Sequence, residues 1–360
     1  MKPTDIPAIR LQNQQIASPQ FKTDKELVQW MGAMQAQDYN MSKWAVGTRL
    51  PGSTEKQIEL SLDKGEVIRT HLMRPTWHLV SADDIYWMLE LTAPQILSSL
   101  RSRHKELELS ETVIKKSNTL IEKALIKNEN LTREELVAEF KKAKISIGDN
   151  RAAHLLMLAE LTGLICSGAT KGNKQTYALL AKRVPGKKTL PREEAIAKLT
   201  ENYFQSHAPA TLQDFVWWSG LPVADAKRGL EFNKSQLVSE TIGDETYWLP
   251  ASFSYGETHA GSIHLLPAYD EFIISYKNRN VILDGADHKK AVSNNGIFRP
   301  VILINGKVSG IWKRTIKNND VIIETDLFRP HNKKEISLIK KASGIFGNFL
   351  EKRPEFKQDK

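Results

Sequence analysis

The 360-residue sequence predicts an α+β fold, mainly α, with three tandem winged-helix motifs and a C-terminal antiparallel β-barrel-like domain. Three observations favour it: a helix-turn-helix and hairpin over residues 208–250, two earlier copies of that pattern, and a β-type texture after about residue 256. At roughly 150 residues per domain, a chain of this length holds two or three units. The predicted boundaries are residues 1–100, 101–185, 186–255 and 256–360.

The clearest copy is the third motif. Thr211 is a natural N-cap for the helix LQDFVWWSG, Gly220 supplies the turn, and Pro222 opens the second helix, VADAKRGLE. The run LVSETIGDETYWLP then forms two strands about a Gly-Asp turn. Its tip carries Asp244 and Glu245, which would repel phosphate, so simple docking of this hairpin on a nucleic-acid backbone is doubtful.

The second motif has a capping-box pattern at Thr132 and Glu135, followed by the helix RAAHLLMLAELTGL. Its strands, LICSG and QTYALL, are joined by the basic tip ATKGNK. Lys171 and Lys174 lie in that tip, where a backbone phosphate is within reach.

The first motif is less regular. The sequence predicts one helix over KELVQWMGAMQAQ and another over EKQIELSLDKG. It predicts two strands over VIRTHLMRPTWHLVS, with a turn near Met73 to Pro75. This assignment places Gln35 and Gln37 at the end of the first helix.

The C-terminal region alternates β-branched and aromatic residues over IHLLPAYDEFIISYK and GIFRPVILINGKVSGIWKRTIKNNDVIIETDLF. Asn305-Gly306 and Asn318-Asn319 are turn signals. The sequence therefore predicts a small antiparallel sheet or barrel, which ends in the amphipathic helix KKEISLIKKASGIFGNFLEK.

Composition narrows the class of protein. With 41% hydrophobic and 26% charged residues, the chain is typical of a folded soluble protein. Its first residues lack the apolar core of a signal peptide, and no run of about 18 apolar residues spans a membrane, so we expect a cytoplasmic protein. The single cysteine, Cys166, excludes an internal disulfide, and its apolar neighbours predict a buried thiol.

The net charge of +9 favours a polyanionic partner. Residues 141–188 hold ten Lys and Arg against two acids, a local balance of +8. A cluster of one sign this concentrated favours contact with a phosphate backbone over a merely solvated basic face.

Gln35 and Gln37 are neutral amides without nucleophilic power, so chemistry at this motif must need orientation rather than a strong base. Residues two apart on a continuous helix point about 200° away from each other. Both amides therefore converge only if the helix ends or unwinds near them.

Four runs, MQAQDY, RTHLMRPTWHLVSADD, LLPAYDEFIISYKNR and GIFRPVILINGKVSGIWKR, resemble in that order the AlkZ and YcaQ-type bacterial DNA glycosylases. The resemblance covers nearly the whole chain. It implies three winged helices arranged on a β-barrel, forming a C-shaped monomer around alkylated double-stranded DNA. It further implies cleavage of the N-glycosidic bond of N7-alkylpurines, in some members with unhooking of interstrand crosslinks.

The family motif is glutamine, an apolar residue, then glutamine in one branch or aspartate in the other. Gln35-Ala36-Gln37 matches the first branch, which implies that Gln35 and Gln37 are catalytic; Asp38 lies one position late for the second. Alkylation at N7 makes the purine cationic and a good leaving group. What remains is to place a water and stabilise developing positive charge, which amide oxygens can do.

Other candidates have weaker patterns. Arg69, Arg74, Lys277 and Arg279 are candidates for DNA contact. His71 and His78 are better explained as structural hydrogen-bonding residues, and because no third ligand converges on them we expect no metal site and no cofactor.

Two adjacent pairs have structural explanations. Asp270 and Glu271 would point to opposite faces of a strand, which argues against a shared catalytic site. Trp217-Trp218 is typical of core packing rather than of base stacking.

The sequence thus favours a monofunctional DNA glycosylase that leaves an abasic site. The alternative is a transcriptional or architectural winged-helix protein that binds DNA without catalysis. The intact Gln-Ala-Gln motif favours the enzyme, because a regulator has no evident need for it.

Overall fold

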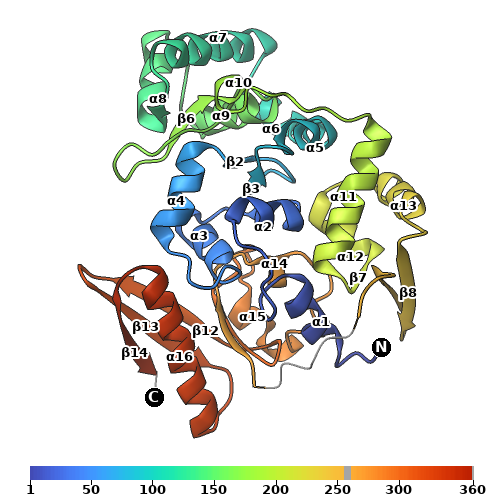
Figure 1. Cartoon of the computed structure of the whole chain (residues 1–360). Helices are drawn as coiled ribbons and strands as arrows, with labels where there is room; N and C mark the ends of the chain where they lie inside the picture. Colours follow the sequence, from blue (N-terminus) through green and yellow to red (C-terminus); the bar gives the residue numbers. More distant parts are fainter. Residues whose placement is uncertain (255–260, 359–360) are drawn as a thin grey trace. The chain divides into compact units, whose positions relative to one another are not determined.

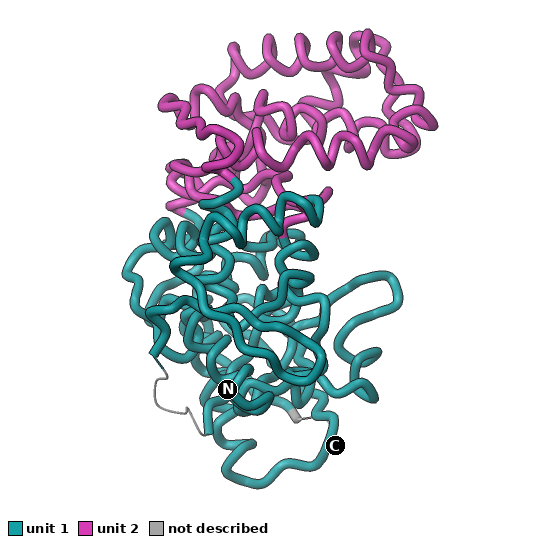
Figure 2. Tube along the Cα trace, turned by 90° about the vertical axis from the view of Figure 1, so that its right-hand side faces the viewer, with its two compact units in different colours: residues 1–59, 196–218, 222–360 teal, residues 60–195, 219–221 magenta. Residues whose placement is uncertain are grey.

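The computed structural model describes residues 1–254 and 261–358, which form two compact units (Figure 2). Unit 1 comprises Met1–Glu59, Ile196–Trp218 and Pro222–Lys360, and unit 2 comprises Leu60–Ala195 and Ser219–Leu221. The predicted boundary between residues 255 and 256 falls outside the described residues. Within the described ranges, no helix is both long and apolar enough to cross a membrane.

Unit 1 carries both ends of the chain (Figure 1). Its elements are α1 (Ile6–Asn13), α2 (Asp24–Met31), β1 (Met34–Gln35), α3 (Tyr39–Gly47), β7 (Ala210–Thr211), α12 (Leu212–Ser219), α13 (Val223–Phe232), β8 (Leu237–Ile242), β9 (Glu245–Pro250), β10 (Ile263–Leu266), α14 (Glu271–Ile274), η1 (Gly285–Asp287), α15 (His288–Ala291), β11 (Val301–Ile304), β12 (Lys307–Ile316), β13 (Asp320–Leu327), α16 (Lys333–Phe349) and β14 (Arg353–Gln358). Two helices, α4 (Glu55–Lys64) and α11 (Arg192–His207), run across the boundary in sequence between the units, and the last residue of α12, Ser219, is assigned to unit 2.

Unit 2 is mostly helical. Its elements are β2 (Val67–His71), β3 (Trp77–Ser81), α5 (Ile85–Ser99), α6 (Arg101–Glu106), α7 (Glu111–Lys127), β4 (Leu131–Thr132), α8 (Arg133–Lys142), α9 (Arg151–Leu161), β5 (Ile165–Ser167), β6 (Thr176–Leu179) and α10 (Leu180–Arg183).

Local sequence signals place several elements as predicted. Thr132 and Glu135 form the capping box of α8, with each side chain bonded to the other residue's backbone N–H. Thr211 accepts a hydrogen bond from the backbone N–H of Asp214 in α12. The β8–β9 hairpin turns at Gly243, whose positive φ of 60° suits glycine.

The helix predicted over KELVQWMGAMQAQ is too long, because α2 ends at Met31. Gly32, with φ of 74°, breaks it, and a Cβ there would meet the Trp218 ring at 3.4 Å. The helix α3, which the sequence analysis missed, starts after Asp38. The glutamine motif is therefore a short extended segment between two helices.

The C-terminal part of unit 1 is a five-stranded sheet in the order β10-β11-β12-β13-β14, curled into a half-barrel. The turn between β11 and β12 uses Asn305 and Gly306, both with positive φ, as predicted. One strand differs from the antiparallel prediction: β14 pairs parallel with β13. The helix α16 lies between them in sequence and provides the long crossover that a parallel pair requires.

A buried ion pair lies in the core of unit 1. The Arg49 guanidinium contacts both carboxylate oxygens of Asp270 at 2.8 Å, and neither side chain is exposed. Arg49 also donates to the backbone oxygens of Gln14 and Ala45. Because the remaining donors are satisfied, the pair is a well-bonded arrangement rather than a stray buried charge.

We expect Asp270→Ala to lower the free energy of unfolding by about 3–5 kcal/mol, because it leaves the Arg49 charge buried without its counterion. Urea unfolding followed by circular dichroism measures the change. The matched control is Lys56→Ala, which removes an exposed ion pair with Glu351 and should hardly shift the midpoint. Equal shifts for the two variants would contradict the structural role of the buried pair.

Candidate active site

Gln35 and Gln37 have different environments. Gln35 is 4% exposed, whereas the side chain of Gln37 is exposed. The Gln35 Oε1 accepts hydrogen bonds from the backbone N–H groups of Ala36, at 2.8 Å, and Gln37, at 3.1 Å. The two amides therefore do not act alike: Gln35 folds back on the chain, and Gln37 is the amide that faces outward.

Glu271 lies directly behind this motif. Its Oε1 accepts a hydrogen bond of 2.5 Å from the Gln35 backbone N–H. Its Oε2 accepts from the Trp218 indole Nε1 at 3.0 Å and from the Ser275 hydroxyl. With 2% exposure, this carboxylate is enclosed by donors from three separate segments.

The Glu271 carboxylate is ionised. Burial raises its pKa, but the facing His207 ring and the hydrogen bonds from Ser275 and the Gln35 N–H outweigh burial and lower the pKa below the usual range of a carboxyl group. The His207 Nε2 lies 3.6 Å from Glu271 Oε2. Burial lowers the pKa of His207, so the ring is neutral at neutral pH and the carboxylate keeps its charge.

The acids next to the motif have structural roles. Asp38 is the N-cap of α3, and its side chain accepts from the Met41 N–H at 3.0 Å. Asp270 caps the short helix α14 by accepting from the Phe272 N–H. The strand expected through Asp270 and Glu271 is therefore wrong: a helical turn carries Glu271 towards the motif, and Asp270 pairs with Arg49.

Sequence reasoning missed most of this enclosure. Glu271 belongs to the family block LLPAYDEFIISYKNR, so the block was a usable signal for it, whereas His207 and Trp218 had none. Arg314 on β12 was also missed; burial lowers the pKa of its guanidinium, while the charge of Asp38 acts in the opposite direction. The Arg314 guanidinium therefore lies close enough to Asp38, the residue after Gln37, for their charges to interact.

The arginines proposed for DNA contact are partly enclosed. Arg69 is 9% exposed, donates to Gln175 Oε1 at 2.7 Å and lies over the Trp77 ring at 4.4 Å. Arg74 is half-buried, with a positive φ of 55°. In the structure as it stands, Arg69 braces the β2–β3 hairpin rather than facing solvent.

Arg279 braces its own loop and stacks on aromatic rings. Its Nε donates to the Ile273 carbonyl at 2.7 Å, and its guanidinium lies 5.5 Å from the Trp217 ring and 5.0 Å from the Phe298 ring. Its neighbour Lys277 has an exposed side chain.

The wing-tip lysines are exposed, but each has an acidic partner. Lys171 Nζ lies 2.6 Å from Glu135 and Lys174 Nζ lies 3.7 Å from Glu134. Both acids belong to α8, outside the residue window in which the local charge of +8 was counted. Exposed pairs of this kind are weak, so either lysine can exchange its partner for a phosphate at little cost.

The two histidines of the first hairpin are structural, as predicted. His71 Nδ1 lies 2.6 Å from Glu160 Oε2, and His78 Nδ1 lies 3.0 Å from the Thr76 carbonyl. His71 also borders a cavity of about 320 Å³ in unit 2. Over residues 1–254 and 261–358, no group of three or more His, Cys, Asp or Glu could hold a metal ion.

The tryptophan pair divides between core and surface. Trp218 is fully buried, as predicted for core packing, but Trp217 is 39% exposed and donates from Nε1 to the Ile274 carbonyl at 2.8 Å. The expectation that both rings pack in the core is wrong for Trp217.

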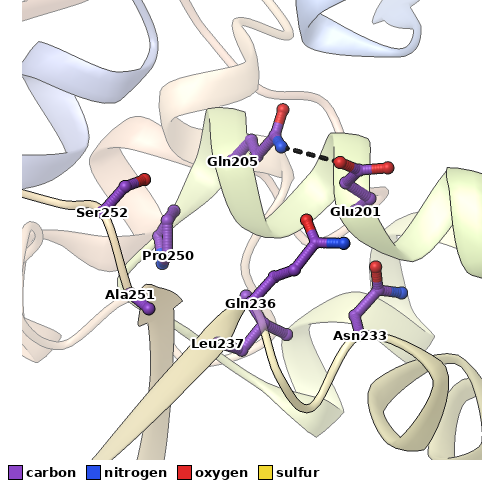
Figure 3. A pocket seen from close by; sticks show the side chains of 8 residues that line it. All are labelled: Glu201, Gln205, Asn233, Gln236, Leu237, Pro250, Ala251 and Ser252. Atoms are coloured by element: carbon purple, nitrogen blue, oxygen red, sulfur yellow. Dashed lines mark hydrogen bonds between the residues drawn. The ribbon is translucent and has the colours of Figure 1, made fainter.

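A second cavity, of about 240 Å³, lies between α11 and the β8–β9 hairpin of unit 1 (Figure 3). Three of its eight lining side chains are amides, and Gln205 donates to Glu201 at 3.0 Å. Its lining residues are Glu201, Gln205, Asn233, Gln236, Leu237, Pro250, Ala251 and Ser252. They hold no nucleophile beside a base, so the chemistry is better sought at Gln37.

Comparison with known proteins identifies the class. A family model for DNA glycosylases matches residues 28–349, which places the chain among enzymes that hydrolyse N-glycosidic bonds in DNA. The family is the AlkZ-like DNA glycosylases, to which the chain belongs. The solved structure of the DNA glycosylase AlkZ from Streptomyces sahachiroi is similar in fold, with a TM-score of 0.81, 17% identity and 100% of each chain covered. No curated protein matches the chain.

Cys166 is buried in β5 and unsuited to nucleophilic chemistry. Burial raises the pKa of its thiol to about 12. At pH 8 the thiolate fraction is then about one part in 10⁴, because the pH lies about four units below the pKa.

We therefore expect the native protein to resist Ellman's reagent at pH 8 and to release one equivalent of chromophore in guanidinium chloride. Free cysteine in the same buffer is the control for reagent activity. Rapid labelling of the native protein would show that the thiol is accessible and would contradict the buried assignment.

Proposed function

We propose that this DNA glycosylase hydrolyses the N-glycosidic bond of N7-alkylated purines in duplex DNA and leaves an abasic site. The observation that carries the proposal is the exposed amide of Gln37, whose backbone is fixed by the buried amide of Gln35. Such a group can place a water and accept its hydrogen bond, but it cannot protonate a leaving base.

This limited chemistry suits a substrate that alkylation has already activated. An N7-alkylpurine is cationic and leaves through an oxocarbenium-like state, so no strong general acid is needed. The amide oxygen of Gln37 orients water on the far face of the sugar, and its dipole favours the developing positive charge. Gln35 acts behind it, by holding the two backbone N–H groups that follow.

We further propose that the protein acts as a monomer in the cytoplasm and that three winged helices, at about residues 1–100, 101–185 and 186–255, position the duplex. The order helix, short strand, two helices and hairpin recurs in all three motifs and supports this proposal. The proposed phosphate contacts are the exposed lysines Lys171, Lys174 and Lys277. Further DNA contacts are proposed for Arg69, Arg74 and Arg279. Because the amide is exposed, a bulky adduct or an interstrand crosslink need not enter a tight pocket.

A duplex that contains N7-methylguanine provides the test, with alkaline cleavage to reveal abasic sites. We expect release above the buffer control, and a loss of about 100-fold or more in single-turnover rate for Gln37→Ala, because the water loses its positioning group. Gln35→Ala should also be impaired. Gln57→Ala, which removes another exposed amide of unit 1, is the matched control.

The outcomes separate function from site. No release from any of several alkyl adducts and one crosslink would favour the alternative, a non-catalytic DNA-binding protein. Release that survives both Gln35→Ala and Gln37→Ala would leave the function standing and remove the site.

A separate prediction concerns the contribution of the wing-tip lysines to the salt dependence of DNA binding. Replacing Lys171 and Lys174 together by Gln should reduce the slope of log K against log salt concentration by about 2, because two phosphate contacts are lost. Fluorescence anisotropy at several salt concentrations measures the slope. Lys123→Gln with Lys127→Gln, two exposed lysines of α7, is the control, and identical slopes for the two double variants would refute the wing contact.

A further inference from the structure

Glu271 is a buried carboxylate that the proposed reaction does not itself use. Of the three groups that donate to it, only the Gln35 N–H belongs to the glutamine motif. The other two, from Trp218 and Ser275, hold the opposite oxygen. The carboxylate is therefore fixed in the core by one oxygen and presents the other to the motif.

The contact continues from the core to the surface. Glu271 accepts the N–H of Gln35, and the Gln35 side chain accepts the N–H groups of Ala36 and Gln37. Three successive backbone N–H groups thus have a defined acceptor. The segment needs this support, since β1 has only two residues and irregular backbone follows it up to Asp38. Without it, Gln37 would sample several backbone orientations.

We propose that Glu271 is the positioning residue of the active site: by holding the Gln35 N–H, it fixes the backbone from which the Gln37 amide reaches the substrate. The inference rests on the proposed glycosylase function. Because Glu271 is only 2% exposed, it acts through Gln35 rather than on the substrate.

The charge of Glu271 matters as well as its shape. A charged acceptor makes a stronger hydrogen bond than a neutral one, so an amide at this position would hold the Gln35 N–H less firmly. Two of the nearby cations are paired, Arg49 with Asp270 and Arg10 with Asp214, and the ring of His207 is neutral. A third, Arg314, interacts with the charge of Asp38. The residual negative charge beneath the motif favours a sugar that becomes cationic.

The test is Glu271→Gln, which keeps the volume and removes the charge. We expect the single-turnover rate on N7-methylguanine duplex to fall about 10- to 100-fold, as small displacements of a positioning group do, with unchanged affinity for the duplex. The matched control is Asp225→Asn, which neutralises another buried carboxylate of unit 1, on α13, where it pairs with the half-exposed Arg228. Its rate per folded molecule should equal that of the wild type.

A double-mutant cycle with Gln37→Ala distinguishes positioning from general destabilisation. If Glu271 acts through Gln37, adding Glu271→Gln to Gln37→Ala should change the rate by less than about twofold. A multiplicative loss, or a single variant as fast as the wild type, would overturn the inference. An inactive wild type would instead refute the proposed function.

Ser275→Ala keeps the inference testable if Glu271→Gln does not fold. It removes one donor to the fixed oxygen and leaves the bond to Gln35 in place. We expect a loss of severalfold in rate and faster amide hydrogen exchange at residues 35–37, relative to Asp225→Asn. Unchanged rate and exchange in this variant would count against a positioning role for Glu271.

Discussion

The hydrogen bond from the Gln35 N–H to Glu271 joins segments that are 236 positions apart in the chain. The rest of unit 1 is arranged so that Glu271 is held at this point. Asp270 caps the same helical turn and pairs with Arg49. On the far side, the Ser275 carbonyl accepts from the Tyr203 hydroxyl at 3.1 Å. Residues 270–276 are thus a polar junction to which the N-terminal and middle segments attach.

Such a junction is costly, because each carboxylate and guanidinium must leave water. The cost is offset by satisfaction of the partners: the Tyr276 hydroxyl donates to the His207 carbonyl and accepts from Gln14 Nε2, at 2.8 and 3.0 Å. A core of leucines would tolerate small shifts of one helix against another. A network of directional hydrogen bonds does not tolerate such shifts, and the orienting role proposed for the glutamine motif depends on that restriction.

The sequence was most informative where the signal was local. Capping residues such as Thr132 and glycine-containing turns such as Asn305-Gly306 determine their elements by nearby hydrogen bonds and sterics. The residues 34–37 and 269–275 are different: their conformation follows from contacts with each other, which no window of either segment contains. That is why a strand was expected through Glu271 and a helix through Gln35.

The same limit applies to charge and exposure. The count over residues 141–188 was correct in sequence, yet Lys171 faces Glu135 from outside that window. From the motif alone, both glutamines were equally good candidates for a catalytic role. Only the fold shows that Gln35 is buried and Gln37 is exposed. The family resemblance located the motif but did not assign separate roles to its two amides.

The arrangement of a carboxylate beneath an amide bears on which lesions such a site can process. With a lowered pKa and only 2% exposure, Glu271 is a poor base and is out of reach of an attacking water. Asp38, one residue beyond the motif, is occupied in capping α3. In the proposed mechanism the site therefore positions a water and supplies a negative potential that stabilises developing positive charge. An unmodified purine needs a proton on its leaving nitrogen, which neither glutamine can give, whereas an N7-alkylpurine already carries positive charge. Under the proposed function, selectivity for damaged bases would therefore follow from the absence of a general acid in the motif as much as from its contacts.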